Sequence, residues 1–290
     1  MEKFTVLSLF DGISCGQVAL NRAGIKYDQY FASEIDTNAI KVTQHNYPDT
    51  KQLGSVLNVY GKDLPKIGLL IAGSPCQGFS FCGKQLNFND ERSKLFFEFV
   101  RLLKETKPKY FLLENVRMKK EYQDVISEHL GVQPIVINSS LVSAQNRVRL
   151  YWSNIPISPC QDKGILIKDI IEQKPINEYE FVHEGLSKNG RKCKSYLQCD
   201  GSGKGNRSQN YRSYFLDGKI GTLSFSAPHG AKILMEDGQI RKTTRIEHER
   251  LQTLPENYTS AIDLNKAKSA IGNGWTVDVI AHIFQGLKNI

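Results

Sequence analysis

The sequence lacks the features that mark several classes of protein. Its longest clearly apolar run is Ile67 to Gly73, far below the roughly 18 residues that a membrane-spanning helix needs. The six cysteines form no Cys-x-x-Cys pair and have no histidine partner at ligand spacing. No secretory signal or internal repeat is present. These absences predict free thiols in a reducing compartment, with no metal site, no disulfide framework and no membrane association.

Composition and charge narrow the class further. The 290 residues allow one large domain or two modest ones, and 40% hydrophobic with 23% charged residues excludes disorder, collagen and a coiled coil. The net charge is +8. Between Leu186 and Lys219 there are eight Lys or Arg residues against Asp200 and Asp217, a net of +6. Such an excess suits a polyanionic partner, and a solvated surface loop is the alternative.

Short apolar runs alternate with helical periodicity in the first half of the chain. We predict strands at 4–9, 30–33, 69–72 and 110–113, with Asp36 capping the helix after the second strand. This alternation predicts an α/β fold with a doubly wound, mostly parallel sheet.

The texture of the sequence changes after about Trp152. Residues 154–240 are rich in Gly, Ser, Lys and Asn, which predicts a small irregular domain between a first domain at 1–153 and a return segment at 241–290. Thr276 is expected to cap a closing helix that docks back on the first domain. Its apolar stripe consists of Val277, Ile280, Ile283, Phe284 and Leu287.

Two features suggest a site for a nucleoside-bearing ligand. The first predicted strand ends in Phe10-Asp11-Gly12-Ile13-Ser14-Cys15-Gly16, where small residues let a ligand approach the backbone. Glu34, which is 22 residues beyond Gly12, has the position of an acid that grips ribose hydroxyls. A tight loop with a solvated carboxylate is the alternative, and the pair alone leaves both open. The Gly-x-Gly-x-x-Gly fingerprint is absent, which disfavours a Rossmann dehydrogenase.

A thiol and a carboxyl group are expected at the same sheet edge. Gly73-Ser74-Pro75-Cys76-Gln77-Gly78 follows one apolar strand, and small neighbours leave the Cys76 sulfur accessible as a nucleophile. Glu114 follows the next strand. Farther on, Gln145, Arg147 and Arg149 are two apart and would share one face of a strand, where the arginines suit phosphate or carbonyl contacts. An edge strand with a solvated basic face is the alternative.

The ordered motifs resemble the DNA cytosine carbon-5 methyltransferase family. They are Phe-Asp-Gly-Ile-x-x-Gly, Glu34, Gly-Ser-Pro-Cys-Gln, Glu-Asn-Val, Gln-x-Arg-x-Arg, Arg-Leu-Gln-x-x-Pro at 250–255, and Gly272-Asn273-Gly274-Trp275. The match spans nearly the whole chain. It is most similar to the de novo branch of animals, although the short length is typical of a bacterial or phage form acting in the cytoplasm.

This resemblance implies a fold, a donor and a substrate. The fold is a Rossmann-like methyltransferase domain with a target-recognition domain at 154–240. Catalysis is expected from Cys76, Glu114, Arg147 and Arg149 on a cytosine flipped out of duplex DNA, and DNA contacts from Gln145, Lys192, Lys194, Lys204 and Arg207. The donor is S-adenosylmethionine, and its expected site consists of Phe10, Asp11, Gly12, Ile13, Ser14, Cys15, Glu34, Ile35, Val56, Leu95, Asn273, Gly274 and Trp275.

Several positions depart from the family pattern. Ser55 stands where the family usually has an Asp that contacts the adenine amino group, Arg245 follows Thr244 in place of Pro, and Thr253 replaces a common Gly. The alternatives to DNA methylation are a tRNA cytosine methyltransferase and a non-catalytic DNA-binding relative. The missing Cys-Phe-Thr triplet and the presence of both Cys76 and Glu114 favour the DNA enzyme. A cognate restriction endonuclease is a further candidate partner, and the sequence indicates no oligomeric state.

Overall fold

The computed structural model describes residues 4–73, 91–174, 179, 197–199, 212–223 and 231–289. By their contacts the residues form two compact units. The first unit consists of Met1–Asn138, Val148–Cys160 and Val277–Ile290, and the second of Ser139–Arg147 and Gln161–Thr276. The expected return segment at 241–290 is therefore divided, since only its last 14 residues group with the first unit.

A seven-stranded sheet forms the centre of the first unit, in the order β3-β2-β1-β4-β5-β8-β6. All pairings from β3 to β5 are parallel, and β8 is antiparallel to both β5 and β6. The strands are β1 (Phe4–Leu9), β2 (Tyr27–Ser33), β3 (Lys51–Gln52), β4 (Ile67–Gly73), β5 (Tyr110–Val116), β6 (Ile135–Asn138) and β8 (Val148–Ser153). The four strands predicted from apolar runs are all present, three of them longer than expected.

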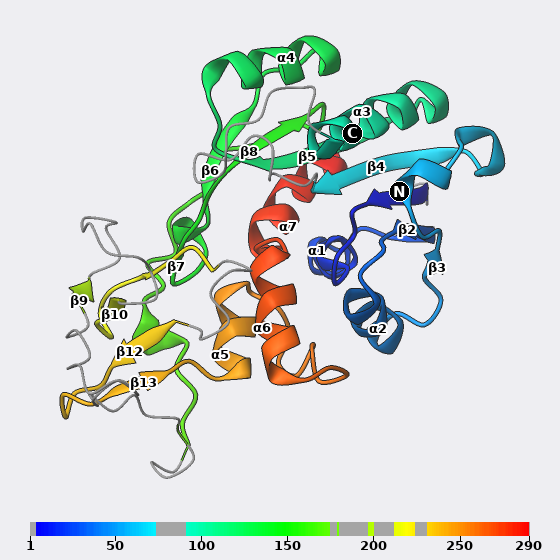
Figure 1. The fold of residues 1–290 in the computed structure, drawn as a ribbon. Helices are drawn as coiled ribbons and strands as arrows, with labels where there is room; N and C mark the ends of the chain where they lie inside the picture. Colours follow the sequence, from blue (N-terminus) through cyan, green and yellow to red (C-terminus); the bar gives the residue numbers. More distant parts are fainter. Residues whose placement is uncertain are drawn as a thin grey trace. The chain divides into compact units, whose positions relative to one another are not determined.

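Helices cover both faces of this sheet, as the doubly wound prediction requires. On one face, Leu70 of β4 and Leu113 of β5 pack in a core with Phe99 of α3 and Ile126 of α4. The next residue of β4, Ile71, is buried on the opposite face. α1 and α7 pack against each other on that opposite side (Figure 1). The helices are α1 (Cys15–Ala23), α2 (Thr37–Asn46), α3 (Glu91–Thr106), α4 (Lys120–Leu130) and α7 (Val277–Gln285).

Two of the predicted helix signals are confirmed. Asp36 caps α2, because its Oδ1 accepts hydrogen bonds from the backbone amides of Asn38 (2.8 Å) and Ala39 (3.4 Å). α7 begins directly after Thr276, and the predicted apolar stripe is buried. The closing helix belongs to the first unit, where it packs against α1.

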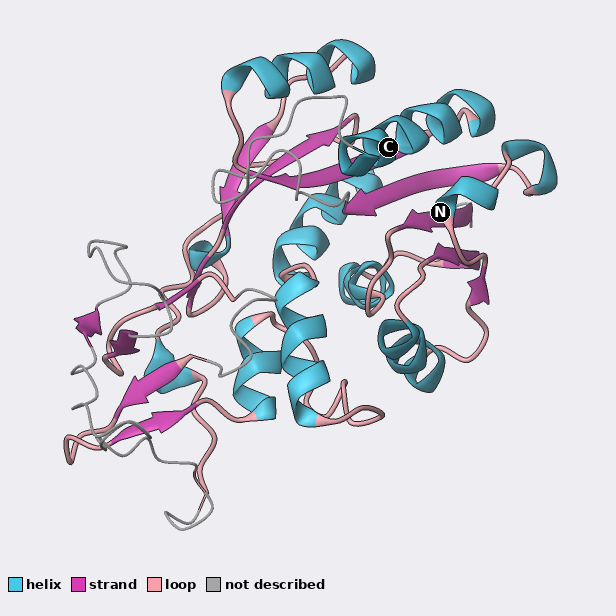
Figure 2. Ribbon diagram, viewed as in Figure 1, coloured by secondary structure: helices cyan, strands magenta, loops and turns pink. Residues whose placement is uncertain are grey.

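The described residues of the second unit form short strands and two helices (Figure 2). Its strands form a four-stranded sheet, β13-β12-β10-β9, and a two-stranded sheet, β11-β7. They are β7 (Gln145–Asn146), β9 (Leu197–Cys199), β10 (Arg212–Tyr214), β11 (Ile220–Gly221), β12 (Lys232–Leu234) and β13 (Ile240–Lys242). Two helices, α5 (Arg245–Leu251) and α6 (Leu264–Asn273), pack against each other in this unit.

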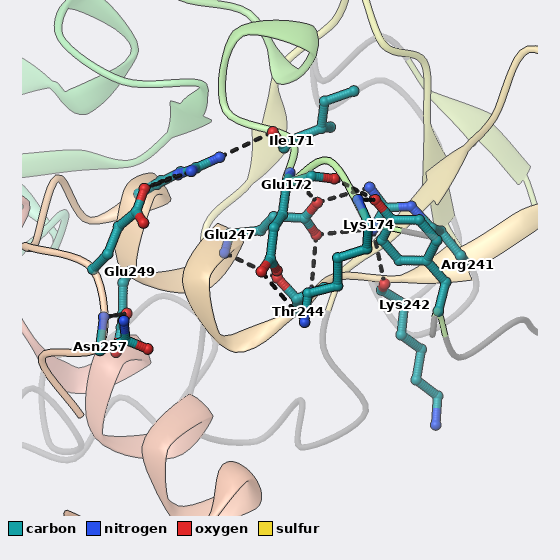
Figure 3. A network of polar contacts seen from close by, with 12 residues as sticks. Ile171, Glu172, Lys174, Arg241, Lys242, Thr244, Glu247, Glu249 and Asn257 are labelled. Carbon is teal, nitrogen blue, oxygen red and sulfur yellow. Dashed lines mark hydrogen bonds and ion pairs between the residues drawn. The ribbon is translucent and has the colours of Figure 1, made fainter. Parts of the chain in front are cut away.

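A buried ion pair ties β13 to α5 in the second unit (Figure 3). Arg241 and Glu247 are fully buried, and two hydrogen bonds of 2.7 and 2.9 Å join them. Glu247 also accepts hydrogen bonds from the amides of Thr244 and Glu172 (both 2.9 Å), and the Thr244 hydroxyl accepts one from the Glu247 amide in a capping box. Each oxygen of this carboxylate is thus satisfied without water.

The described ranges contain neither a membrane-spanning helix nor a metal-binding cluster. No helix there is long and apolar enough to cross a membrane. No group of three or more His, Cys, Asp or Glu side chains in those ranges is arranged to hold a metal ion.

Candidate active site

Three left-handed residues shape the loop that follows β1. Phe10, Gly12 and Ser14 have φ angles of 56°, 59° and 61°. A non-glycine residue in this conformation costs about 1–3 kcal/mol and persists only where its surroundings hold it. A Cβ atom added to Gly12 would meet no heavy atom within 4 Å, so the loop is open at that point. A strained, open loop at the carboxyl end of a parallel strand is typical of a ligand-binding position.

The Asp11 carboxylate accepts two hydrogen bonds that fix this loop. Its Oδ2 accepts a hydrogen bond from Ser14 Oγ (2.6 Å) and its Oδ1 accepts one from the Tyr30 hydroxyl (2.8 Å). Ser14 Oγ in turn accepts a hydrogen bond from Gln17 Nε2 (2.9 Å). Burial raises the pKa of Asp11 to about 6, and the nearby Glu34 carboxylate adds to the rise, which these hydrogen bonds partly offset.

Glu34 lies directly after β2, at the position predicted for a ribose-binding acid. Its Oε2 accepts a hydrogen bond from the Gly12 amide (2.7 Å), and its Oε1 accepts from the amides of Ile35 (2.7 Å) and Asp36 (2.8 Å). These charge-assisted bonds fix the carboxylate against the loop after β1. Ile35 beside it is 75% exposed. An acid next to an exposed apolar side chain suits a ligand that has both hydroxyl groups and a flat apolar part.

The segment after β3 is held by a side chain that we did not single out from the sequence. Nη2 of Arg101, on α3, donates hydrogen bonds to the carbonyls of Val59 (2.8 Å) and Val56 (3.3 Å). Val56 lies in the apolar core with Leu95 packed against that core. Ser55 Oγ accepts a long hydrogen bond (3.4 Å) from the amide two residues on and begins a short 3₁₀ turn. Arg101 also pairs with Glu98 and Glu105 on α3, a spacing that the sequence shows, but its bonds to the backbone carbonyls of another segment leave no mark in the sequence.

An ion pair joins the ends of β5 and β8. Arg149 Nε lies 2.9 Å from Glu114 Oε1, and the side chains are 12% and 10% exposed. In the β5–β8 register Arg149 pairs with Val116, so Arg149 and Glu114 are diagonal neighbours on one face. Gly73, the last residue of β4, pairs with Glu114 on its other side. A largely desolvated carboxylate with a compensating guanidinium therefore stands at the carboxyl edge of the parallel strands.

The predicted nucleophile Cys76 lies in segment 74–90, outside the described residues. The predicted DNA contacts Lys192, Lys194, Lys204 and Arg207 also lie outside them. Their roles stay predictions. The described residues of β4 end at Gly73, and because Gly73 pairs with Glu114, the segment that carries Cys76 starts beside this acid.

Arg147 and Arg149 do not share one strand face, contrary to the sequence-based expectation. Arg147 lies between the end of β7 and the start of β8, and it belongs to the second unit. Its buried guanidinium donates hydrogen bonds to the carbonyls of Leu223 (2.9 Å) and Gly274 (3.0 Å). Arg149 belongs to the first unit and pairs with Glu114. The alternation rule failed here because the chain passes between two sheets at Arg147.

Gln145 also has an internal place in the second unit. It is fully buried, its Nε2 donates to the Leu251 carbonyl (3.1 Å) and to Gln252 Oε1 (3.2 Å), and its Oε1 accepts from the Leu223 amide (2.9 Å). Gln252 Nε2 then donates to the Gly274 carbonyl (3.0 Å). These bonds connect the Gln-x-Arg, Arg-Leu-Gln and Asn-Gly-Trp motifs. They favour a structural role for Gln145 over the predicted contact with DNA.

The turn that ends α6 presents the other predicted donor residues. Asn273 is exposed and Trp275 is half-buried, on either side of Gly274. The carbonyl of Gly274 accepts from both Arg147 and Gln252. The turn is thus fixed through its backbone, while its two larger side chains keep exposed surface.

A doubly wound sheet with an acid after β2 and a loop of left-handed residues after β1 is a Rossmann-like fold, and solved structures of methyltransferases share it. The solved structure of the Entamoeba histolytica methyltransferase EhMeth superposes with a TM-score of 0.79 at 18% identity, over 100% of this chain and 99% of that one. The sequence carries the match further. The family model for C-5 cytosine-specific DNA methylase matches residues 4–153 and 123–289. The chain belongs to this family.

Relatives that match along nearly the whole of this chain support this assignment. Type II methyltransferase M1.ScrFI of Lactococcus lactis subsp. cremoris is 30% identical over 319 residues, which cover 99% of this chain and 79% of the relative. Type II methyltransferase M.HpaII of Haemophilus parainfluenzae is 28% identical over 317 residues, covering 96% of this chain and 87% of the relative.

Proposed function

We propose that this protein transfers a methyl group from S-adenosylmethionine to carbon 5 of cytosine in duplex DNA. The observation that carries the proposal is the Glu114–Arg149 ion pair at the sheet edge, beside the strand that leads to Cys76, in a chain of the C-5 cytosine methylase family. A binding module would need neither a reactive thiol nor a desolvated carboxylate.

The residues of the first unit fit the proposed donor. Glu34 has the position that binds ribose hydroxyls, Ile35 offers an exposed apolar surface for a base, and the loop is open at Gly12. Ser55 replaces an acid and gives a weaker acceptor for an adenine amino group. The family resemblance assigns Asn273 and Trp275 to the donor as well, and that assignment stays a prediction. When bound, the donor supplies a methyl group attached to a positively charged sulfur.

The chemistry explains why a thiol and a carboxyl group are paired. Carbon 5 of cytosine is a poor nucleophile, so the Cys76 thiolate adds to carbon 6 and makes carbon 5 electron-rich. Glu114 acts here as the carboxylic acid: it accepts a hydrogen bond from the exocyclic amine and gives its proton to N3, which neutralises the charge that this addition creates, and it takes the proton back when the ring is restored. After carbon 5 has taken the methyl group, a base removes the proton there. The electron pair of that C–H bond restores the ring double bond and expels the Cys76 thiolate.

The two arginines receive different tasks in this proposal. Arg149 lies against Glu114 and fixes the position of its carboxylate. Arg147 holds the carbonyls of Leu223 and Gly274, so a direct contact of Arg147 with the flipped base is not favoured by its placement. The cytosine must leave the duplex stack to reach this site, at a cost of about a few kcal/mol.

We propose duplex DNA as the partner, contacted by the basic segment Leu186–Lys219. The rival substrate is tRNA on the same scaffold, but the matching family and both similar relatives are named for DNA or type II methylation. Replacing Lys192, Lys194, Lys204 and Arg207 with Ala should weaken DNA binding and flatten its salt dependence. The log–log slope should fall by roughly 0.9 for each phosphate that the variant no longer neutralises. An unchanged slope in a folded variant would remove this segment from the interface.

The decisive experiment combines plasmid DNA, tRNA, labelled donor and purified protein. We expect label in DNA and 5-methylcytosine at defined sites, and those sites also give the recognition sequence. Cys76→Ser should abolish turnover, and Glu114→Gln should lower kcat strongly while DNA affinity persists. Glu121→Gln, an exposed acid on α4, is the matched control and should behave as wild type. Label only in tRNA, or in Cys76→Ser at the wild-type rate, would refute the proposal.

The type II names of the relatives suggest a restriction–modification setting for this chain as well. In that setting a cognate restriction endonuclease would cut the same sequence when it is unmethylated. Digesting the methylated plasmid with endonucleases of the mapped specificity tests this, because protection is expected only after methylation.

A further inference from the structure

A short segment after β3, residues 54–61, is bonded to β2 at its start. Ser33, the last residue of β2, donates a hydrogen bond from its Oγ to the Gly54 carbonyl (2.8 Å). Leu57 of this segment is 58% exposed, and Ile35, which follows β2, is 75% exposed. Two neighbouring stretches of chain thus expose apolar side chains at the carboxyl ends of parallel strands, where folds of this kind bind their ligands.

A guanidinium from α3 holds the turn in the middle of the 54–61 segment. Residues Val56–Asn58 form a 3₁₀ turn. Nη2 of Arg101 donates hydrogen bonds to the carbonyl of Val56, where the turn begins, and to the carbonyl of Val59, which directly follows the turn. Both ends of the turn are therefore attached to one nitrogen atom. Because hydrogen bonds to a charged group contribute more than neutral ones, this contact attaches the turn firmly to α3.

The Arg101 side chain is itself fixed by residues of α3. Its Nε and Nη2 lie 2.9 and 2.7 Å from Glu98 Oε2, and its Nη1 lies 2.9 Å from Glu105 Oε1. The guanidinium carbon lies 5.6 Å from the centre of the Tyr60 ring. Each nitrogen of the guanidinium has a partner, so its orientation is set within the protein. A lysine ammonium lacks the planar fork that makes this set of contacts.

A second contact with α3 lies at the end of the same segment. Glu105 Oε2 accepts a hydrogen bond from the Gly61 amide (2.7 Å). A Cβ atom added to Gly61 would lie 2.7 Å from Glu105 Cβ and 3.2 Å from the Glu105 carbonyl carbon. The helix and the segment therefore touch so closely that an extra methyl group does not fit between them.

On the basis of the proposed function, we infer that Arg101 is a positioning residue for the methyl donor: it fixes the 54–61 segment as part of the surface that binds the donor's base. Arg101 acts through the segment and touches no ligand. A ligand that binds an already fixed segment loses no free energy in ordering it, so the contacts of α3 increase donor affinity. The base is remote from the transferred methyl group. Loosening the segment should therefore weaken donor binding and leave the chemical step unchanged.

Calorimetric titration with S-adenosylmethionine, together with steady-state kinetics on plasmid DNA, tests this inference. Arg101→Met should raise the donor Kd and the donor KM by about tenfold, the size expected when one charge-assisted attachment is lost, while kcat and the KM for DNA stay at the wild-type values. Arg101→Lys keeps the charge without the fork and should recover part of the donor affinity. Lys120→Met is the matched control, because it removes an exposed cation paired with Asp124 on α4, and it should bind the donor as wild type does.

A second variant disturbs the same contact without removing a charge. Gly61→Ala adds the methyl group for which α3 leaves no room, so the segment must shift and the donor Kd should again rise severalfold. Thermal unfolding sets the temperature at which each variant is folded for these measurements. A purely structural role would lower the melting temperature and leave the donor Kd of the folded protein unchanged, or would raise the KM values for donor and DNA together. Either result would overturn this inference alone, whereas a wild type that binds no S-adenosylmethionine would refute the proposed function.

Discussion

The two units of the molecule bury different kinds of side chain. In the first unit, apolar residues of β1, β4 and β5 pack against helices on both faces of the sheet. Among the described residues of this unit, one charged side chain, that of Glu114, is buried. The second unit buries six in its described part: Arg147, Lys232, Arg241, Glu247, Glu249 and Lys268. Both units have an apolar core, and the second adds buried charged groups, which each need a partner.

This difference has consequences for how each unit fails. An apolar core loses stability gradually, in proportion to the atoms removed. A buried charge network fails sharply when one partner is removed, because the remaining charge is left in a poorly solvating environment. The contrast is testable at its strongest point, the Arg241–Glu247 pair (Figure 3).

The largest effect is expected from Arg241→Met. It leaves the fully buried Glu247 carboxylate without its cation, so the free energy of unfolding should fall by about 3–5 kcal/mol. Urea denaturation measures this change. Lys266→Met is the matched control, because it breaks an ion pair with Asp263 whose side chains are more than half exposed, and it should cost well under about 1 kcal/mol. Similar decreases in the two variants would show that the buried network does not stabilise the second unit.

A second prediction compares how the stability of the fold depends on pH through one titrating group of each unit, Asp11 and His248. In the folded protein the pKa of Asp11 is about 6, whereas its ordinary value is 3.8. The protonated Asp11 therefore stabilises the fold fully below pH 3.8, and this stabilisation is lost as the pH rises through 6. Burial, followed by the charge of Lys268, lowers the pKa of His248 to about 4 from 6.5. Its contribution is full above pH 6.5 and is lost as the pH falls toward 4. Each is worth about 3 kcal/mol, with opposite sign.

Single substitutions should separate these two effects. Asp11→Asn should leave the His248 dependence, so stability falls as the pH is lowered from 6.5 to 4. His248→Gln should leave the Asp11 dependence, so stability rises as the pH is lowered over the same range. Thermal unfolding in a series of buffers measures both slopes. Parallel profiles for the two variants would contradict the opposite pH dependences assigned to Asp11 and His248.

The smallest predicted effect is the gain in stability when a residue with a positive φ angle is replaced by glycine, and it is compared between Thr253 and Ser14. Thr253 has φ 53°, a conformation that a β-branched residue adopts only under strain, and it stands where the family commonly has glycine. Thr253→Gly should raise the free energy of unfolding by about 1 kcal/mol and leave donor affinity unchanged. Ser14→Gly relieves a similar angle in the first unit, but it removes the hydrogen bond to Asp11 and should weaken donor binding. Calorimetry on both variants checks this; equal effects on donor affinity would contradict it.

Much of the first unit could be predicted from the sequence. Runs such as Leu69 to Ala72 are typical of interior strands, so four strands of the seven-stranded sheet could be predicted from hydropathy, whereas the strand order could not. The Asp36 cap and the acid at Glu34 follow from local chemistry in the same way, because their partners lie within a few residues or at the end of the next strand. The motifs also indicated the family, which the matching family model confirms.

The second unit was harder to predict from the sequence, because many of its contacts are polar and join residues far apart in the chain. Gln145, Gln252 and the Gly274 carbonyl are far apart in sequence, and no periodicity links an amide to a distant carbonyl. The position of Arg147 shows the limit clearly. Spacing alone placed it on one face with Arg149, but the chain changes sheets there, and that change exists only in the folded protein.

Residue type and local spacing were enough to predict the parallel strands of the first unit, the acid after β2 and the family. Which carboxylates acquire partners depended on the folded arrangement. Glu114 gains Arg149 from an antiparallel strand that enters between β5 and β6, and Glu247 gains Arg241 from a short ribbon. Asp11 meets Glu34 and Tyr30 across the same loop, and only that meeting sets its proton affinity. Charge interactions depend on distance and burial, and neither quantity exists until the chain has folded.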